Sequence, residues 1–268
     1  MKLRKYHGLG NDYFVLEELT AASLSPELVI RVCHRHTGAG SDGILELVDS
    51  NVADFGLRIH NPDGSQAEKS GNGLRIFARW LVDHREACSR FTVEVPAGVV
   101  KCSVEPDLIT VGMGTGTFEP SSVPVSTDSE AIDYPHPELP LSFSAVGIGN
   151  PHCVVFCDDP VDSLPWREWG ERLESDPLFP NRTNVQFVNI LSNCEVDIRI
   201  WERGAGETMA SGSSSCAVVA AALRKGLVRD GEISVRMPGG VLSVTINTNY
   251  EITLAGPVKL VGSFDFVE

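Results

Sequence analysis

Long apolar segments are absent from this chain of 268 residues. No run of 18 uncharged apolar residues occurs, and the basic start, with Lys2, Arg4 and Lys5, is not followed by the apolar stretch of a signal peptide. These absences predict a cytoplasmic protein with no membrane partner. Positive charge is also scarce, because 22 Lys and Arg stand against 36 Asp and Glu, a net charge of −14. We therefore expect no nucleic-acid partner, since such a chain repels phosphates.

Cysteine pairs and familiar catalytic motifs are missing as well. Seven scattered cysteines do not form the pattern of a disulfide scaffold, so they predict reduced thiols. Cys153 and Cys157 lack a second matching pair, and we expect no bound metal. The G-x-G-x-x-G match at Gly38–Gly43 precedes a strand-like run instead of a helix, which argues against a dinucleotide. No G-x-S-x-G elbow surrounds Ser70 or Ser211, so triad-type serine hydrolysis is unsupported.

What the chain does contain is an internal repeat. The segment Gly8–Tyr13 (GLGNDY) recurs as Gly147–His152 (GIGNPH), which places equivalent asparagines 139 residues apart. Two polar, glycine-containing loops, 61–73 and 201–213, then both carry Ser-Gly followed by Asn or Ser near their ends. With 42% hydrophobic and 22% charged residues, the composition is that of an ordinary globular protein, so the repeat predicts two similar folded halves.

A helix signal follows each loop. Apolar residues repeat at helical spacing from Leu74 to Leu81, and the segment 217–223 is apolar on all sides and so predicts a buried helix. Ser70 and Ser211 then stand at helix N-termini, where serine is a favoured cap. Between these landmarks the sequence predicts strands at 91–95, 99–104, 108–111, 196–201, 233–237 and 242–246. Both halves are therefore α+β, and the proline-rich stretch from residue 112 to about residue 140 predicts the linker between them.

The two Ser-Gly loops are the candidate functional site. If two similar domains face each other, both loops and both helix N-termini lie at one interdomain cleft. Helix N-termini favour anions, so this cleft predicts a pocket for the carboxylate of a small zwitterion. Glu202 and Arg203 could clamp an ammonium and a carboxylate, and His152 could hold either a substrate group or its own loop. The plainer alternatives are simple helix caps, a solvated Glu-Arg pair and asparagines that make turns.

Six spaced motifs point to one family. They are His7-Gly8-Leu9-Gly10-Asn11-Asp12, Asn61-x-Asp63-Gly64-Ser65-x-Ala67-Glu68, Gly71-Asn72-Gly73-x-Arg75, Gly149-Asn150-Pro151-His152, Phe179-Pro180-Asn181-Arg182-x-Asn184-Val185 and Glu202-Arg203-Gly204-x-Gly206-Glu207-Thr208. In this order they closely resemble diaminopimelate epimerase, and the likeness runs from Lys5 to the C-terminus.

The resemblance implies an α+β fold of two pseudo-twofold-related domains, each a mixed sheet wrapped around a central helix, with the active site in the interdomain cleft. It implies domains at 1–116 and 117–256, with a final strand near 257–268 that returns to the first domain. It also implies an isomerase, homodimeric and without a cofactor, that converts LL- to meso-diaminopimelate by two-base 1,1-proton transfer in lysine biosynthesis. The expected partner is diaminopimelate or a similar amino acid.

Carried over residue by residue, the resemblance places substrate binding at Asn11, Asn61, Gly71, Asn72, Asn150, Asn184, Glu202, Arg203, Gly212 and Ser213. Ser70 and Ser211 occupy the two positions of the family's catalytic cysteines and are the expected catalytic residues. A thiol is readily tuned toward thiolate at a helix N-terminus, whereas a serine hydroxyl is a much weaker acid that needs an adjacent base.

The Ser/Ser pair leaves alternatives beside the epimerase. One is a lyase or racemase that acts on another amino acid, and the other is a catalytically inactive amino-acid-binding protein. Further departures from the family pattern at Lys69, Ile76 and Ser213–Ser214 favour natural divergence over engineering. Release of a keto product would identify the lyase, and binding without exchange of the Cα proton would identify the binding protein.

Overall fold

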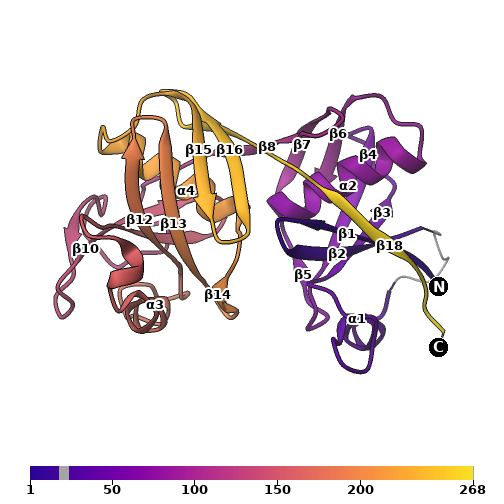
Figure 1. The fold of residues 1–268 in the computed structure, drawn as a ribbon, viewed down its shortest axis with the longest axis horizontal. Helices are drawn as coiled ribbons and strands as arrows, with labels where there is room; N and C mark the ends of the chain where they lie inside the picture. Colours follow the sequence, from indigo (N-terminus) through magenta and orange to yellow (C-terminus); the bar gives the residue numbers. More distant parts are fainter. Residues whose placement is uncertain (18–23, 268) are drawn as a thin grey trace. The chain divides into compact units, whose positions relative to one another are not determined.

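The computed structural model describes residues 1–17 and 24–267, which form two compact units (Figure 1). Unit 1 comprises Met1–Gly112 and Ala255–Glu268, and unit 2 comprises Met113–Leu254. Strands β8 (Ile109–Thr115) and β17 (Glu251–Gly256) carry the chain from one unit to the other. None of the helices in the described part has the length and apolarity needed to cross a lipid bilayer.

Unit 1 contains a mixed sheet in which β18, β1, β2, β3, β4, β6, β7 and β8 are neighbours in that order. The bounds are β1 (Lys2–Gly8), β2 (Asn11–Leu16), β3 (Ile44–Val48), β4 (Phe55–His60), β6 (Arg90–Val95), β7 (Gly98–Val104) and β18 (Lys259–Asp265), with the short β5 (Gln66–Ala67) beside β4. The β2–β3 and β4–β6 pairs are parallel and the others antiparallel. The yellow β18 lies beside the indigo β1 in Figure 1, so the two ends of the chain share one sheet.

Helix α2 (Gly71–His84) forms the centre of unit 1. It begins at the N-cap Ser70, whose hydroxyl accepts the N–H of Gly73, and its first eight residues are all buried. Because α2 contacts β1 and β2 as well as the distant strand β7, the sheet curves around it (Figure 1). Helix α1 (Pro26–Cys33) is capped by Ser25, with proline at the first helical position, and packs into a separate apolar cluster with β1 and β2.

Unit 2 repeats this order of elements. Its strands are neighbours in the order β9, β10, β11, β12, β13, β15 and β16, with β14 beside β13. The bounds are β9 (Tyr134–Pro135), β10 (Ser142–Gly147), β11 (Pro151–Phe156), β12 (Asn184–Ser192), β13 (Glu195–Glu202), β14 (Gly206–Thr208), β15 (Gly231–Met237) and β16 (Gly240–Ile246). The β11–β12 and β13–β15 pairs are parallel, which matches β2–β3 and β4–β6 in unit 1.

The central helix of unit 2 is α4 (Gly212–Arg224), which contacts β10, β11, β12 and β16. A one-turn 3₁₀ helix (Val161–Ser163) and helix α3 (Trp166–Glu174) connect β11 to β12, as α1 connects β2 to β3. In both units a hairpin, β1–β2 in unit 1 and β10–β11 in unit 2, turns at a glycine in the left-handed region, Gly10 (φ 94°) and Gly149 (φ 80°), where a side chain would be strained. The repeat in the sequence is therefore a repeat of topology, and the predicted α+β fold with a central helix in each half is confirmed.

The predicted linker, residues 112 to 140, is wrong as a description of this segment. Its apolar residues Val123, Val125, Ala131 and Leu139 belong to the apolar core of unit 2. The backbone is also tied down, because Thr117 and Gly147 exchange both of their N–H···O bonds. The prolines indicated a loop correctly, but a few well-spaced apolar side chains are enough to bury such a loop against a sheet.

Because Val123 is fully buried, the substitution Val123→Thr should lower the free energy of unfolding by about 1–3 kcal/mol, the cost of burying a hydroxyl without a partner. Val241→Thr is the matched control, since Val241 lies on β16 with 49% of its surface exposed, and its effect should stay below about 0.5 kcal/mol. Urea-induced unfolding measures both variants. Equal stabilities would mean that the segment is a true linker.

Candidate functional site

The sequence-predicted residues of unit 1 gather around the N-terminus of α2. Asn11 is the first residue of β2, Asn61 follows β4, and Ser70, Gly71 and Asn72 form the cap and first turn of the helix. Asn72 donates its side-chain N–H to Oδ1 of Asn11 at 2.9 Å, which joins the helix to the start of β2. Four of the predicted residues are thus brought together by the helix cap and one amide pair.

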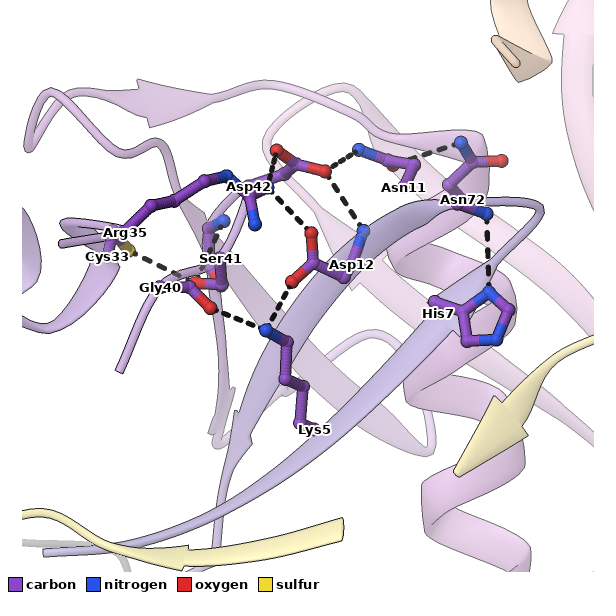
Figure 2. Close-up of polar contacts among 12 residues, drawn as sticks. Lys5, His7, Asn11, Asp12, Cys33, Arg35, Gly40, Ser41, Asp42 and Asn72 are labelled. Atoms are coloured by element: carbon purple, nitrogen blue, oxygen red, sulfur yellow. Dashed lines mark hydrogen bonds and ion pairs between the residues drawn. The ribbon is translucent and has the colours of Figure 1, made fainter. Parts of the chain in front are cut away.

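The amide of Asn11 also reaches the loop before β3 (Figure 2). Its Nδ2 donates to Oδ2 of Asp42 at 2.8 Å, and the same oxygen accepts the N–H of Asp12 at 3.0 Å. On the other side, Arg75 donates to Oδ1 of Asn72 at 2.7 Å from a fully buried position on α2. The orientation of both amides is therefore set by charged neighbours on either side.

Ion pairs with two basic residues, Arg35 and Lys5, hold Asp42 and its neighbour Asp12 in place (Figure 2). Arg35 contacts Asp12 at 2.7 Å and Asp42 at 2.6 Å, and Lys5 contacts Asp12 at 2.7 Å. Burial alone would raise the pKa of Asp12, but hydrogen bonds from Arg35 and Lys5 outweigh it and hold the pKa below its ordinary value. Asp12 is therefore anionic at neutral pH, and the G-x-G-x-x-G segment serves here as the loop that carries Asp42.

Asn61 has a different surrounding. Its Nδ2 donates to Oγ of Ser65 at 3.0 Å, and its backbone N–H donates to the carbonyl oxygen of Ser65 at 2.8 Å. Ser65 in turn bonds to Asp63. These contacts are turn chemistry, the plainer alternative for this residue.

Ser70 has a second contact besides its capping bond. The hydroxyl of Tyr13, on β2, lies 3.3 Å from Oγ of Ser70, and Tyr13 is 7% exposed. The N–H groups of Gly71 and Asn72 precede the first intrahelical hydrogen bond, so they are directed out of the helix end. This end of α2 therefore offers a hydroxyl and backbone donors side by side, an arrangement suited to an anion.

In unit 2, Asn150 is oriented by His152. Nε2 of His152 lies 2.9 Å from Oδ1 of Asn150, and because that oxygen only accepts, Nε2 carries the proton. His152 is fully buried, and burial lowers its pKa to about 3, opposed by a hydrogen bond with Gln186 and reinforced by the charge of Arg203. The ring is therefore neutral. Of the two roles considered for His152, the structure shows the one that holds its own loop.

The Glu202–Arg203 turn is held by two buried polar residues. Oδ1 of Asn184 accepts the N–H of Arg203 at 3.1 Å, and its Nδ2 donates to the carbonyl of Pro151 at 3.0 Å. Glu174, at the end of α3, accepts the N–H of Gly204 at 2.6 Å. Asn184 thus connects the start of β11 to this turn through its whole amide, and Arg203 lies exposed with one contact to the carbonyl of Asn181.

Ser211 is the N-cap of α4, but its side chain makes no capping hydrogen bond. It is 7% exposed, and its carbonyl accepts the hydroxyl of Ser215 at 2.8 Å. The first helical turn is anchored by Gln186 of β12, which donates to Oγ of Ser214 at 3.0 Å. Gly212 and Ser213 are then the first residues of the helix, with N–H groups that precede its internal bonds. Ser211 is therefore at a helix N-terminus as predicted, but its hydroxyl is not committed to the cap.

The residues that support these sites were not among those predicted from the sequence. In unit 1 they are Tyr13, Asp42 and Arg75, and in unit 2 Glu174 and Gln186. Arg75 lies in one of the six family motifs and Asp42 lies in the G-x-G-x-x-G match, so the sequence contained a signal for both. Glu174 and Gln186 look like ordinary helix and strand residues. All seven cysteines are free thiols, and residues 1–17 and 24–267 contain no cluster of three or more metal-binding side chains.

The sequence of this chain is similar to known proteins over both units. The sequence profile of the family "Diaminopimelate epimerase" matches residues 3–119 and 144–261, so it includes the candidate residues of both units. The chain belongs to the diaminopimelate epimerase family. It is 44% identical to "Diaminopimelate epimerase 2" of Nostoc sp. over 96% of this chain and 93% of that one. It is 38% identical to the diaminopimelate epimerase of Carboxydothermus hydrogenoformans over 97% of each chain. The protein is therefore an isomerase of this family.

Solved structures agree at the level of the fold. A phenazine biosynthesis protein of the PhzF family from Bacillus anthracis aligns with a TM-score of 0.72 at 17% identity, over 100% of this chain and 99% of that one. A hydroxyproline epimerase from Agrobacterium vitis, with bound trans-4-hydroxy-L-proline, aligns with a TM-score of 0.70 at 16% identity, over 100% and 90% of the two chains. At these identities the likeness identifies a fold shared with epimerases of the same architecture.

The neutral state of His152 has a measurable consequence. Below the ordinary histidine pKa of about 6.5, the unfolded chain binds a proton that the folded chain refuses until the pH nears 3, so acid destabilises the fold. The free energy of unfolding should fall by up to about 1.4 kcal/mol per pH unit on this account. His152→Gln should therefore flatten the stability profile between pH 6.5 and 4, measured by urea unfolding.

The control for this measurement is His36→Gln, at an exposed position, which should leave the slope of the unsubstituted chain unchanged. A His152→Gln profile parallel to that of the unsubstituted chain would contradict a neutral buried ring.

Proposed function

We propose that this chain converts LL- to meso-diaminopimelate by 1,1-proton transfer without a cofactor, as a cytoplasmic step of lysine biosynthesis. One observation carries the proposal. Each unit contains a buried helix whose N-terminus presents a serine, followed by backbone N–H groups that precede the internal hydrogen bonds of the helix. Inversion at a carbon needs one proton-transferring group for each face, and the chain supplies two equivalent ones. Family membership over both halves supports the assignment.

In the proposed mechanism, N–H groups at the two helix ends bind the α-carboxylate and stabilise the negative charge that develops when the α-proton leaves. One of Ser70 and Ser211 accepts the α-proton as its own hydroxyl proton passes to a base, and the other gives its hydroxyl proton to the opposite face. Asn11, Asn72 and Asn150 donate hydrogen bonds to the substrate from orientations that their own partners set.

The remaining predicted residues divide by their contacts. We propose that Glu202 and Arg203 bind the ammonium and carboxylate groups of the substrate, because Arg203 extends into solvent from a firmly held turn. We propose supporting roles for Asn61 and Asn184, whose amides contact their own loops. Gly71, Gly212 and Ser213 contribute backbone N–H groups. On the family resemblance we also propose a homodimer.

The alternatives raised by the two serines are not favoured. A binding protein or a lyase would have to arise within a set of relatives that are named as epimerases and are 35–44% identical over nearly the whole chain. A hydroxyl in place of a thiol does require help with ionisation, since serine is poorly nucleophilic and weakly acidic without a base.

The purified protein should exchange the Cα proton of LL-diaminopimelate for deuterium in deuterium oxide, followed by NMR, and should produce the meso isomer. Ser70→Ala and Ser211→Ala should each lower the rate by about 100-fold or more, because each removes one proton-transferring group. Ser163→Ala, at an exposed position of the one-turn 3₁₀ helix, is the matched control.

The paired variant Ser70→Cys with Ser211→Cys separates the outcomes. Exchange by the unsubstituted chain establishes the epimerase with hydroxyl groups in place. Exchange by the double-cysteine variant alone would overturn the activity while retaining the substrate site, and no exchange by either would overturn the substrate as well.

Asp42→Asn tests whether a supported amide matters. The carboxamide keeps the shape of Asp42 but loses its charge and presents N–H groups, so it cannot accept from both Asn11 and Arg35. We expect kcat/KM for diaminopimelate to fall about 10-fold, the effect of one poorly satisfied polar group. Asp49→Asn removes the same charge from an exposed loop and should leave kcat/KM unchanged. Equal effects of the two variants would show that overall charge, not the Asn11 contact, is what matters.

A further inference from the structure

The phenol of Tyr13, which is closer to a thiol in acidity than a serine hydroxyl is, lies beside Ser70. The phenol oxygen of Tyr13 is 3.3 Å from Oγ of Ser70, and that Oγ also accepts the N–H of Gly73 at 3.0 Å. An O–H···O distance of 3.3 Å is looser than the usual value of about 2.8 Å, and catalytic hydrogen bonds are often loose before substrate binds. Because Oγ of Ser70 acts as the acceptor toward Gly73, its own hydroxyl proton remains available for exchange with the phenol.

The ring of Tyr13 is held so that this contact persists. Tyr13 lies in the middle of β2, which pairs with β1 on one side and β3 on the other. At Gly43 a Cβ atom would lie 2.7 Å from Cε1 of the ring and 2.5 Å from the carbonyl oxygen of His60, so only a glycine lets the backbone approach this closely. Gly43 and the sheet therefore fix the direction of the phenol toward Ser70.

The chemistry of the two hydroxyls is unequal. A phenol ionises with an ordinary pKa of about 10 and a thiol with one of about 8.5, whereas an aliphatic hydroxyl remains protonated far above both values. In a Tyr–Ser pair the phenol is thus the group that can lose and regain a proton, and the serine is the group at the helix N-terminus. Together they supply what one cysteine would supply alone.

We propose that Tyr13 is a positioning residue for the epimerase reaction that acts through Ser70, by holding the exchangeable proton that the serine relays. When unit 1 removes the α-proton, Ser70 accepts it as its own proton passes to the Tyr13 phenolate, which becomes a phenol. When unit 1 delivers, Ser70 gives its proton to the carbanion and takes the phenol proton, which leaves the phenolate that the removal step requires. Protons and charge balance in both directions, and the proposal rests on the proposed function.

The internal repeat provides an independent observation. In the 139-residue register that aligns Asn11 with Asn150, Tyr13 aligns with His152, so each half carries a ring side chain with a hydrogen-bonding group two positions after its asparagine. Both side chains are buried near the start of their strands, and each contacts a residue of the candidate site, Ser70 for Tyr13 and Asn150 for His152. The position of unit 2 that corresponds to Tyr13 therefore also holds a side chain that hydrogen-bonds to the candidate site, although His152 orients an amide there.

The test compares Tyr13→Phe in two backgrounds, with deuterium exchange and epimerisation of LL-diaminopimelate as readouts. In the natural Ser70 background, kcat should fall about 100-fold or more while KM changes less than about threefold, because the lost group transfers protons and does not bind substrate. In the Ser70→Cys background, the same Tyr13→Phe substitution should change kcat less than about threefold, because a thiol needs no relay.

Tyr6→Phe is the matched control. Tyr6 lies opposite Tyr13 on β1, is also buried, and bonds through its hydroxyl to His84 and not to Ser70. It should keep the activity of the unsubstituted chain. Activity of the Tyr13→Phe, Ser70→Cys double variant also shows that removal of the phenol oxygen leaves the fold intact.

The outcomes are distinct. Full activity of Tyr13→Phe, or an equal loss in the serine and cysteine backgrounds, would overturn the relay. Inactivity of the unsubstituted chain would instead overturn the proposed function. The activity of the unsubstituted chain is therefore measured before any Tyr13 variant is made.

Discussion

The structure of each unit depends on placing the first turn of a helix out of bulk water. A buried helix N-terminus leaves several N–H groups without internal partners, and these must be satisfied by a cap, a neighbour or a ligand. In α2 the hydroxyl of Ser70 satisfies one of them, at Gly73. In α4 the anchoring passes to Gln186 and Ser214, which leaves the hydroxyl of Ser211 outside the cap. The same constraint that shapes both cores thus leaves donors available for an anion.

Around these helix ends, polar side chains are organised by their protein partners before any substrate arrives. Asn11 lies between Asp42 and Asn72, and Asn184 bonds both to the start of β11 and to the Glu202–Arg203 turn. An amide whose hydrogen bonds are already made does not reorganise when a ligand binds, so less of the binding energy is lost to ordering. The charged network beneath Asp42 extends this rigidity to the neighbouring loop.

Much of this arrangement could be predicted from the sequence. Apolar spacing identified α2, repeated glycine turns revealed the duplicated topology, and the Ser-Gly loops located both helix ends. The linker was wrong because Val123 and its neighbours are too widely spaced to show a period, although they reach the core of unit 2. Tyr13 and Asp42 escaped notice because their importance lies in contacts with residues 57 and 31 positions away, which no local pattern encodes.

The pairing of β18 with β1 gives the chain an order of completion during synthesis. Unit 1 contains both the first and the last strands, whereas unit 2 is continuous from Met113 to Leu254. A ribosome therefore releases every residue of unit 2 before it releases the strand that completes the sheet of unit 1. Since domains fold as units while the chain emerges, the N-terminal segment must wait with the edge of β1 unpaired, and a truncated product would expose that edge to other chains.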